Sequence, residues 1–353
     1  MIIDTNVQPH FRYNAEIRRY LPDAHQLRSI PDVEQQWYQA PGGDYRQDLY
    51  GEHYPGSDPE TVSRHLFGEA PGGMGVAYAI LNPLTRGNIA DYLLNSRICA
   101  AVNDWLLDRW LEPDIGNRFR GTIRVNPEDP KGAVSEIERL AGHPKLVQVG
   151  VPMQSREPYG KPMFEPIWEA AAAHGLPVAV HINGGNGVDH PPTFAGHAHT
   201  YPGYAAFMPL NYFVHLATLI VEGMFGRHPG LKFVFADGGY DILTPFMWRL
   251  DTFWLSMRDQ TPWVDRYPSE YLPGHVRFCS SAFDGPVEVG KMRRWMDFTG
   301  KSELVMYGSS YPHWSTSSPD VLTSGLKGLD AAQRDKVLWQ NASEFYGLKE
   351  SVR

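Results

Sequence analysis

Two hydrophobic periods alternate along the chain. Short apolar runs rich in Val, Ile, Leu and Phe, each ended by polar residues or by Gly and Pro, predict β-strands. Because these runs are apolar at nearly every position, we expect them to be buried on both faces, as in a parallel sheet covered by helices. The eight predicted strands are 1–6, 74–81, 118–125, 146–152, 177–182, 232–237, 276–281 and 303–309.

Segments with apolar residues three and four apart separate these strands, and one more follows the last strand. Eight strands alternating with helices in 353 residues predict a (β/α)8 TIM barrel of the α/β class, as a single domain over 1–353. A doubly wound open sheet is the alternative fold. The predicted helices are 89–111, 131–142, 163–175, 210–226, 242–257, 287–298 and 331–346.

Two insertions interrupt the alternation. Residues 31–73 show no clear period but contain Trp37 and several tyrosines among many Gly and Pro residues, and residues 184–204 hold three histidines. An insertion of this length is commonly disordered or functional, and the aromatic content favours order. Both lie between a strand and the next element, so we expect long loops at the carboxyl-terminal face of the barrel that cover the substrate. A subunit interface is the alternative.

Composition and charge restrict the partners. The formal net charge of −8 gives no electrostatic footprint for nucleic acid or an anionic membrane. No apolar run reaches the roughly 18 residues of a membrane span, and the first residues lack the pattern of a signal peptide. We therefore expect a cytoplasmic protein that acts on a small molecule. Cys99 and Cys279 have no spacing typical of a disulfide framework or a metal site, so we expect two buried thiols.

Polar segments at the predicted strand ends carry a family resemblance. The segment DTNVQ at 4–8 and the segment YGSSYPHW at 307–314 resemble the Asp-x-His-x-His and Gly-Ser/Thr-Asp-Tyr-Pro-His signatures of the aminocarboxymuconate-semialdehyde-decarboxylase-like branch of the amidohydrolase superfamily. Segments 175–181, 228–239 and 240–251 resemble the same branch, in the same order. The resemblance implies a homodimeric (β/α)8 enzyme that binds zinc or a similar divalent ion. It also implies decarboxylation or hydrolysis of small, often aromatic acids.

The resemblance also shows where this chain departs from the family's metal ligands. Asn6 and Gln8 stand at the two positions of the first strand, and Ser310 stands where the last signature has Asp. His181 and Asp237 occupy the positions on the fifth and sixth strands. A catalytic zinc site takes three ligands from His, Asp, Glu or Cys, and neutral amide oxygens suit harder ions. We therefore predict no metal and no cofactor; a nonstandard site for a divalent ion such as zinc is the alternative.

The same residues form a coherent polar cluster without a metal. His181 can exchange a proton near neutral pH, and Asp237 can hold its tautomer, act as a base or stabilise the imidazolium. Asn6, Gln8 and Ser310 can donate hydrogen bonds to a carboxylate or a developing oxyanion. The alternative is that satisfied polar groups simply fill a former metal cavity.

Two further histidines follow the strands that carry this cluster. His10 lies just beyond the first predicted strand and His313 just beyond the eighth, and each is preceded by a proline that restricts the backbone. Both are expected over the barrel mouth, His10 as a substrate-binding residue and His313 as a catalytic one. The alternative for each is an ordinary polar residue, which is what a loop histidine usually is.

The sequence therefore predicts a metal-independent enzyme of the amidohydrolase fold. It would act as a lyase, such as a decarboxylase, or as a hydrolase on a small organic acid or ester, with an aromatic one as a candidate. One alternative is a metal-dependent decarboxylase or hydrolase that uses His181 and Asp237 with nonstandard partners. The other is an inert binding or scaffolding protein that kept the barrel.

Overall fold

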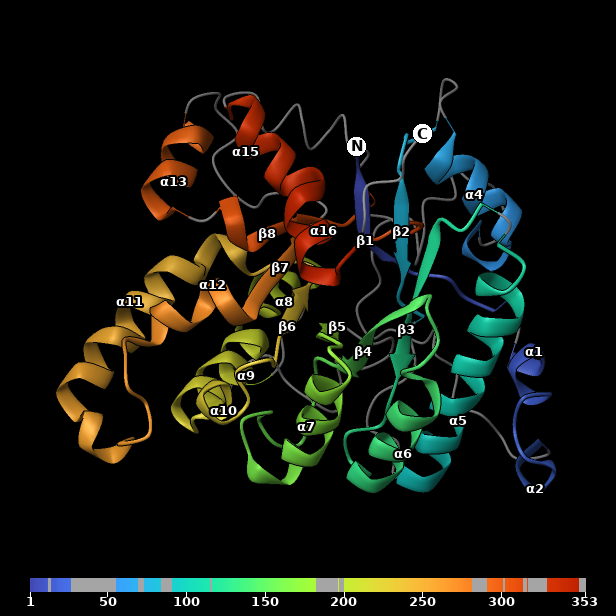
Figure 1. Ribbon diagram of the computed structural model, residues 1–353, viewed down its shortest axis with the longest axis horizontal. Coiled ribbons are helices and arrows are strands. Elements are labelled where there is room, and N and C mark those ends of the chain that lie inside the picture. The colour runs from blue at the N-terminus through green and yellow to red at the C-terminus, as the bar shows by residue number, and fades with distance from the viewer. Residues whose placement is uncertain are drawn as a thin grey trace.

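Eight parallel strands form one sheet in which each strand pairs with the next along the chain (Figure 1). A parallel bridge between Val7 and Tyr311, with the Gln8 N–H donating to the Tyr311 carbonyl at 2.8 Å, joins β1 to the segment after β8 and brings the two edges together. The predicted TIM barrel is confirmed, and the doubly wound sheet is wrong. The computed structural model describes residues 1–11, 14–26, 55–68, 73–83, 91–114, 116–181, 196, 200–280, 291–300, 302–313, 316 and 329–348.

All eight predicted strands are present, and β4 has the predicted bounds. They are β1 (Ile3–Val7), β2 (Tyr78–Leu81), β3 (Phe119–Arg124), β4 (Leu146–Pro152), β5 (Val178–His181), β6 (Phe233–Ala236), β7 (Val276–Ser280) and β8 (Val305–Tyr307). The helices within the described ranges are α1 (Asn14–Arg18), α2 (Asp23–Gln26), α4 (Pro59–Phe67), α5 (Tyr92–Leu106), α6 (Pro130–Leu140), α7 (Glu165–Ala173), α8 (Tyr201–Phe207), α9 (Leu210–Val221), α10 (Met224–Arg227), α11 (Tyr240–Met257), α12 (Leu272–His275), α13 (Lys291–Thr299), α15 (Ala331–Asp335) and α16 (Asn341–Tyr346).

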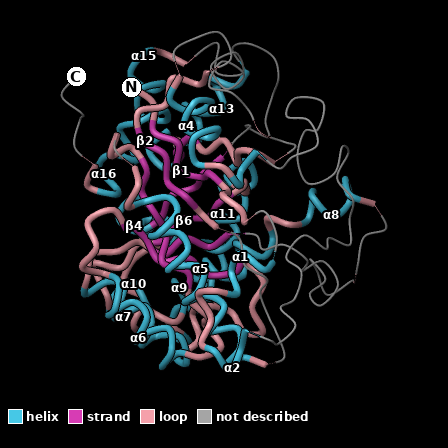
Figure 2. The backbone as a smooth tube through the Cα atoms, turned by 90° about the vertical axis from the view of Figure 1, so that its right-hand side faces the viewer, coloured by secondary structure: helices cyan, strands magenta, loops and turns pink. Residues whose placement is uncertain are grey.

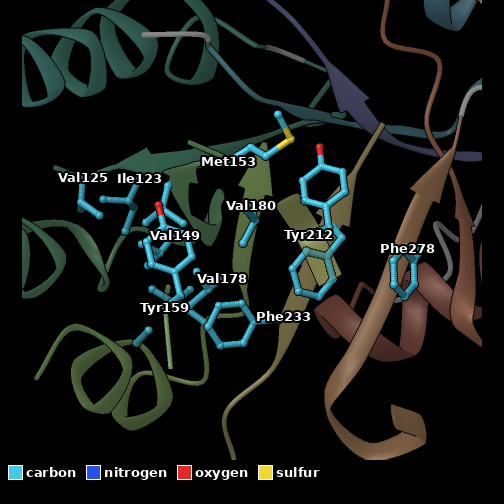
Figure 3. Close-up of a cluster of buried hydrophobic side chains, with 14 of the residues drawn as sticks. Ile123, Val125, Val149, Met153, Tyr159, Val178, Val180, Tyr212, Phe233 and Phe278 are labelled. Atoms are coloured by element: carbon cyan, nitrogen blue, oxygen red, sulfur yellow. The ribbon is translucent and has the colours of Figure 1, made fainter. Parts of the chain in front are cut away.

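The strands occupy the centre of the molecule, with helices packed around them (Figure 2). Outward-facing side chains such as Val149, Val178 and Phe233 form the main apolar core with residues of the surrounding elements, including Tyr159 and Tyr212 (Figure 3). Successive side chains of a strand point to opposite faces, and in this barrel both faces are covered. That burial is why the strands read as nearly continuous apolar runs.

A second, smaller apolar cluster closes the amino-terminal end of the barrel. Helix α16 lies beside β1 and β8 (Figure 1), and its Ala342 and Phe345 pack with residues near the strand beginnings. The strand residues of this cluster are mostly small or unbranched, which lets the side chains of the helix pack closely against them. They include Ile3, Ala179, Val234, Ala236, Cys279 and Met306. Because the amino-terminal end is covered by this cluster, a functional site is expected at the carboxyl-terminal end of the barrel.

Part of the first insertion is regular structure, which corrects the expectation of a segment without a period. Helix α4 (Pro59–Phe67) begins after Asp58, whose side chain accepts the Thr61 N–H, and Val62 and Leu66 are buried on one face. An N-cap followed by Pro and an apolar pair four residues apart is a local helix signal that the aromatic and Gly-rich surroundings obscured. Residues 31–54 and 69–72 of that insertion, and 184–195 and 197–199 of the second, lie outside the described residues.

Two expectations from composition were tested by the structure. Cys99 and Cys279 are buried and neither forms a disulfide, as predicted. Among the described helices, none combines the length and the apolar character needed to cross a membrane.

His215 on α9 is held neutral by its surroundings. Its Nδ1 accepts the Tyr159 N–H at 3.1 Å, and its Nε2 donates to the Met153 carbonyl at 2.7 Å. Burial lowers the pKa of His215 to about 4. Protonation of Nδ1 would remove an acceptor and place a charge in the core, so the folded state requires the neutral ring.

We therefore expect acid to destabilise the fold through His215. An unfolded histidine has a pKa of about 6.5, so between that value and about 4 only the unfolded chain takes up this proton, and stability falls as pH falls. The loss between pH 7 and 5 is about 2 kcal/mol for this residue. Urea unfolding of wild type and His215→Gln at both pH values measures it. The variant should lose less stability than wild type on acidification, whereas equal losses would assign the effect to other groups.

Candidate active site

Polar side chains from four strand ends meet inside the carboxyl-terminal end of the barrel. Asn6 on β1 is at their centre: its Nδ2 donates to Asp237 Oδ1 at 2.8 Å and to Ser310 Oγ at 3.1 Å. Its Oδ1 lies 2.9 Å from Nε2 of His181, the last residue of β5. The predicted residues Asn6, His181, Asp237 and Ser310 are therefore in direct contact, although they are separated by as many as 304 positions in sequence.

The backbone conformation places two of these side chains. Asp237 follows β6 with φ 70°, and Ser310 lies beyond β8 with φ 55°, so both occupy the left-handed region that non-glycine residues rarely adopt. Such conformations persist only when the surrounding structure holds them, and they are concentrated at functional sites. A Cβ on Gly308 would lie 2.9 Å from the Asn6 Cβ and closer still to the Cys279 Sγ. Glycine at this position lets the end of β8 pass against Asn6.

Asp4 ties the two ends of the barrel wall together beneath the cluster. It is fully buried, and its Oδ1 accepts the Asn6 N–H at 3.1 Å and the Ser309 N–H at 2.9 Å. Burial raises the pKa of Asp4 to about 6, against the opposing effect of hydrogen bonds from Ser309 and Asn6. Sequence reasoning did not assign Asp4 a role. Its place as the first residue of the DTNVQ segment was the signal that could have identified it.

The contacts of His181 determine where its proton sits. Its Nε2 is 2.9 Å from Asn6 Oδ1 and 3.1 Å from Asp237 Oδ2, and an ionised carboxylate and an amide oxygen can only accept hydrogen bonds. Nε2 therefore carries hydrogen. Asp237 also accepts from Ser310 Oγ and Asn6 Nδ2, so three donors surround its carboxylate. The His181 side chain is fully buried while that of Asp237 is 17% exposed, which makes the carboxylate the more accessible of the two.

Gln8 and His313 border this cluster. Gln8 Nε2 is 3.5 Å from His181 Nε2, a longer separation than those within the cluster. The backbone N–H of His313 donates to the Ser310 carbonyl at 2.8 Å. Burial lowers the pKa of His313 to about 4, although the charge of Asp237 opposes this shift, so its ring is neutral near pH 7. His10 lies beside Phe11, with its Nδ1 2.6 Å from the Phe11 carbonyl oxygen and the ring centroids 4.4 Å apart.

These donors do not fit the usual catalytic zinc site. Within the described parts of the chain, no group of three or more His, Cys, Asp and Glu residues is placed to hold a metal ion. The cluster supplies one imidazole and one carboxylate, which are hydrogen-bonded to each other, and its other donors are neutral amides and a hydroxyl. A catalytic zinc site normally takes three ligands from the stronger types.

Comparisons with known proteins agree with the barrel. The family model described as Amidohydrolase matches residues 77–348. No curated protein matches the chain in sequence. Among solved structures, an amidohydrolase from Mycobacterium avium subsp. paratuberculosis is similar with a TM-score of 0.76 and 18% identity, over 98% of this chain and 99% of that one.

Two similar structures are named as decarboxylases. The 5-carboxyvanillate decarboxylase LigW from Sphingomonas paucimobilis has a TM-score of 0.68 and 21% identity, over 99% of this chain and 100% of that one. A dihydroxybenzoic acid decarboxylase from Polaromonas, described with bound manganese and the inhibitor 2-nitroresorcinol, has a TM-score of 0.66 and 19% identity, over 99% and 98% of the two chains. At these sequence identities the similarity shows a shared fold and nothing more specific.

Proposed function

Because the chain belongs to the amidohydrolase family, a family of lyases and hydrolases, we propose that it decarboxylates a small aromatic carboxylic acid. We further propose that the polar cluster does this without a divalent metal. The observation that carries the proposal is the Nε2–H of His181, held between Asn6 Oδ1 and Asp237 Oδ2 at the end of the barrel where such enzymes build their sites. Similar structures named as aromatic acid decarboxylases support the substrate class.

The cluster can supply the proton that decarboxylation requires. A proton is added to the ring carbon that bears the carboxylate, the bond from that carbon to the carboxylate carbon breaks, and its electron pair returns to the ring as CO2 leaves. Protonated His181 gives up the Nε2 proton and is then reprotonated from solvent, so the step balances. Asp237 stabilises the imidazolium before transfer. The amide donor of Gln8 is suited to hold the substrate's carboxylate, whereas the hydroxyl of Ser310 already donates to Asp237.

Turnover of hydroxylated benzoic acids by the purified protein tests the reaction. We expect one CO2 released for each arene formed, measured by coupled CO2 detection and chromatography. Cleavage of aryl esters without CO2 would instead identify a hydrolase. Binding of the acids without turnover of either class would support the inert barrel.

The metal content of the protein tests the second part of the proposal. We expect far less than one divalent ion per chain after purification without chelator, because only His181 and Asp237 of the cluster are strong ligands. Elemental analysis by mass spectrometry measures this, and activity should survive treatment with chelator. Near-stoichiometric zinc or manganese that is lost together with activity would refute metal independence, and manganese is the ion named in a similar structure.

A further inference from the structure

A chain of hydrogen bonds runs through the barrel interior from helix α16 to the site. The Tyr346 hydroxyl donates to Gln148 Oε1 at 2.8 Å, and Gln148 Nε2 donates to Asn82 Oδ1 at 2.9 Å. Asn82 Nδ2 then donates to Asn6 Oδ1 at 3.1 Å, and Asn6 Nδ2 donates to Asp237 Oδ1 at 2.8 Å. These bonds connect the helix that closes one end of the barrel with the cluster at the other end.

The direction of the chain follows from its Asp237 end. A carboxylate oxygen only accepts, so Asn6 must turn its amide nitrogen toward Asp237 and its oxygen toward Asn82. Asn82 must then donate its nitrogen, which leaves its oxygen to accept from Gln148. The Gln148 oxygen in turn requires a donor, and Tyr346 provides it. The orientation of each amide therefore fixes which atom the next residue must present, a donor or an acceptor.

The surroundings make reversal of any amide unfavourable. Asn6, Asn82 and Gln148 are all buried, so a misdirected amide cannot turn to water. A reversed Asn6 would place its oxygen against the Asp237 carboxylate and its nitrogen against the Nε2–H of His181. In a buried network, unsatisfied groups of this kind are costly. Thr122 supports the observed orientation of the Gln148 amide, because its Oγ1 accepts the second N–H of that amide at 2.8 Å.

We propose that Tyr346 is a positioning residue for the site: its hydroxyl supplies the donor that the Gln148 oxygen needs, and so helps to hold Gln148 and Asn82 in the direction that the Asp237 end requires, with Asn6 presenting oxygen to His181 and nitrogen to Asp237. Burial raises the pKa of Tyr346 well above its usual value, so the hydroxyl keeps the proton that it donates. Helix α16 therefore contributes to the site through the barrel, from the end opposite to it. This role concerns the orientation of Asn6 and holds for any reaction at the cluster.

Replacement of the hydroxyl tests this role. Tyr346→Phe keeps the ring and removes the donor. Tyr159→Phe is the matched control, because Tyr159 is a buried tyrosine whose hydroxyl also donates to a carbonyl oxygen, that of Pro152, but lies outside the chain of amides. Full-length protein labelled with 15N-histidine gives the readout, and the His181 ring signals are assigned by their loss in His181→Asn. We expect Tyr346→Phe to shift or broaden the His181 signals and Tyr159→Phe to leave them unchanged.

A stability cycle provides an independent measurement. Tyr346 and Asn82 are separated by Gln148, and residues that share no network usually have additive effects. We expect the increase in the unfolding equilibrium constant caused by Tyr346→Phe to shrink about five-fold or more in an Asn82→Ala background, which corresponds to roughly 1 kcal/mol of coupling. The increase caused by Tyr159→Phe should be the same in both backgrounds.

The His181 signals decide the outcome. Unchanged His181 signals in Tyr346→Phe, or equal changes in Tyr346→Phe and the control, overturn the proposal, and an additive cycle does so as well. If Tyr346→Phe fails to fold, Gln148→Met breaks the chain one residue further along and provides the same comparison.

Discussion

Replacement of His181 by Asn is expected to lower turnover by roughly 10²-fold or more, because general acid catalysis by a placed histidine contributes about that much. His181 is the cluster residue whose Nε2–H is held by both Asn6 Oδ1 and Asp237 Oδ2. Asn is smaller than His and retains an amide donor for these oxygens, so we expect the fold to survive. Steady-state kinetics gives the loss, and circular dichroism with thermal unfolding verifies the fold.

A second histidine provides a matched control. His228 also lies beside a carboxylate, with its Nε2 2.9 Å from Glu165 Oε1, but this pair joins the segment after α10 to α7 outside the barrel. His228→Asn should therefore leave turnover unchanged. An active His181→Asn enzyme with an unchanged pH profile would show that another group handles the proton.

Introduction of three metal-ligating side chains into the polar cluster is expected to produce a zinc site with a large gain in affinity. The triple variant Asn6→His, Gln8→His and Ser310→Asp adds three strong ligands beside His181 and Asp237. The structure supports convergence, because Asn6 and Ser310 both contact Asp237 and Gln8 lies 3.5 Å from His181. Zinc affinity should rise by orders of magnitude, as measured by calorimetry.

The same variant should lose its native activity. Without metal, the new carboxylate at position 310 would lie against Asp237, and like charges at such distances repel. Zinc should therefore also raise the melting temperature of the triple variant and leave that of wild type nearly unchanged, since a ligand stabilises the state that binds it. Adding Asp237→Asn to the triple variant is the control, and it should weaken zinc binding. Equal zinc affinity in wild type and triple variant would mean that these positions do not form one metal site.

Local patterns in the sequence determined the fold. The alternation of strand and helix periods depends only on neighbouring residues, and a strand buried on both faces must be apolar throughout, so the barrel could be predicted. Strand ends were visible as the points where apolar runs change to polar residues. Because the carboxyl ends of all barrel strands meet at one face, Asn6, His181, Asp237 and Ser310 could be predicted to lie together.

Which atoms of those residues meet was decided by the tertiary structure. The β1 and β2 register shifts between Asp4 and Val7, so strict alternation along β1 does not show which of its side chains enter the barrel. The positive φ angles of Asp237 and Ser310 aim their side chains at Asn6, and no local signal in the sequence required them.

Long-range pairing also decided the roles of residues that the sequence did not single out. Asn82, Gln148 and Tyr346 read as ordinary residues of a strand end, a strand and a helix, and their connection appears only where they contact one another. The direction of a hydrogen bond depends on both partners, and here the partners lie up to 198 positions apart. Sequence by itself therefore determined the barrel and the place of the site, whereas the orientation of each polar group depended on the neighbours that folding brought to it.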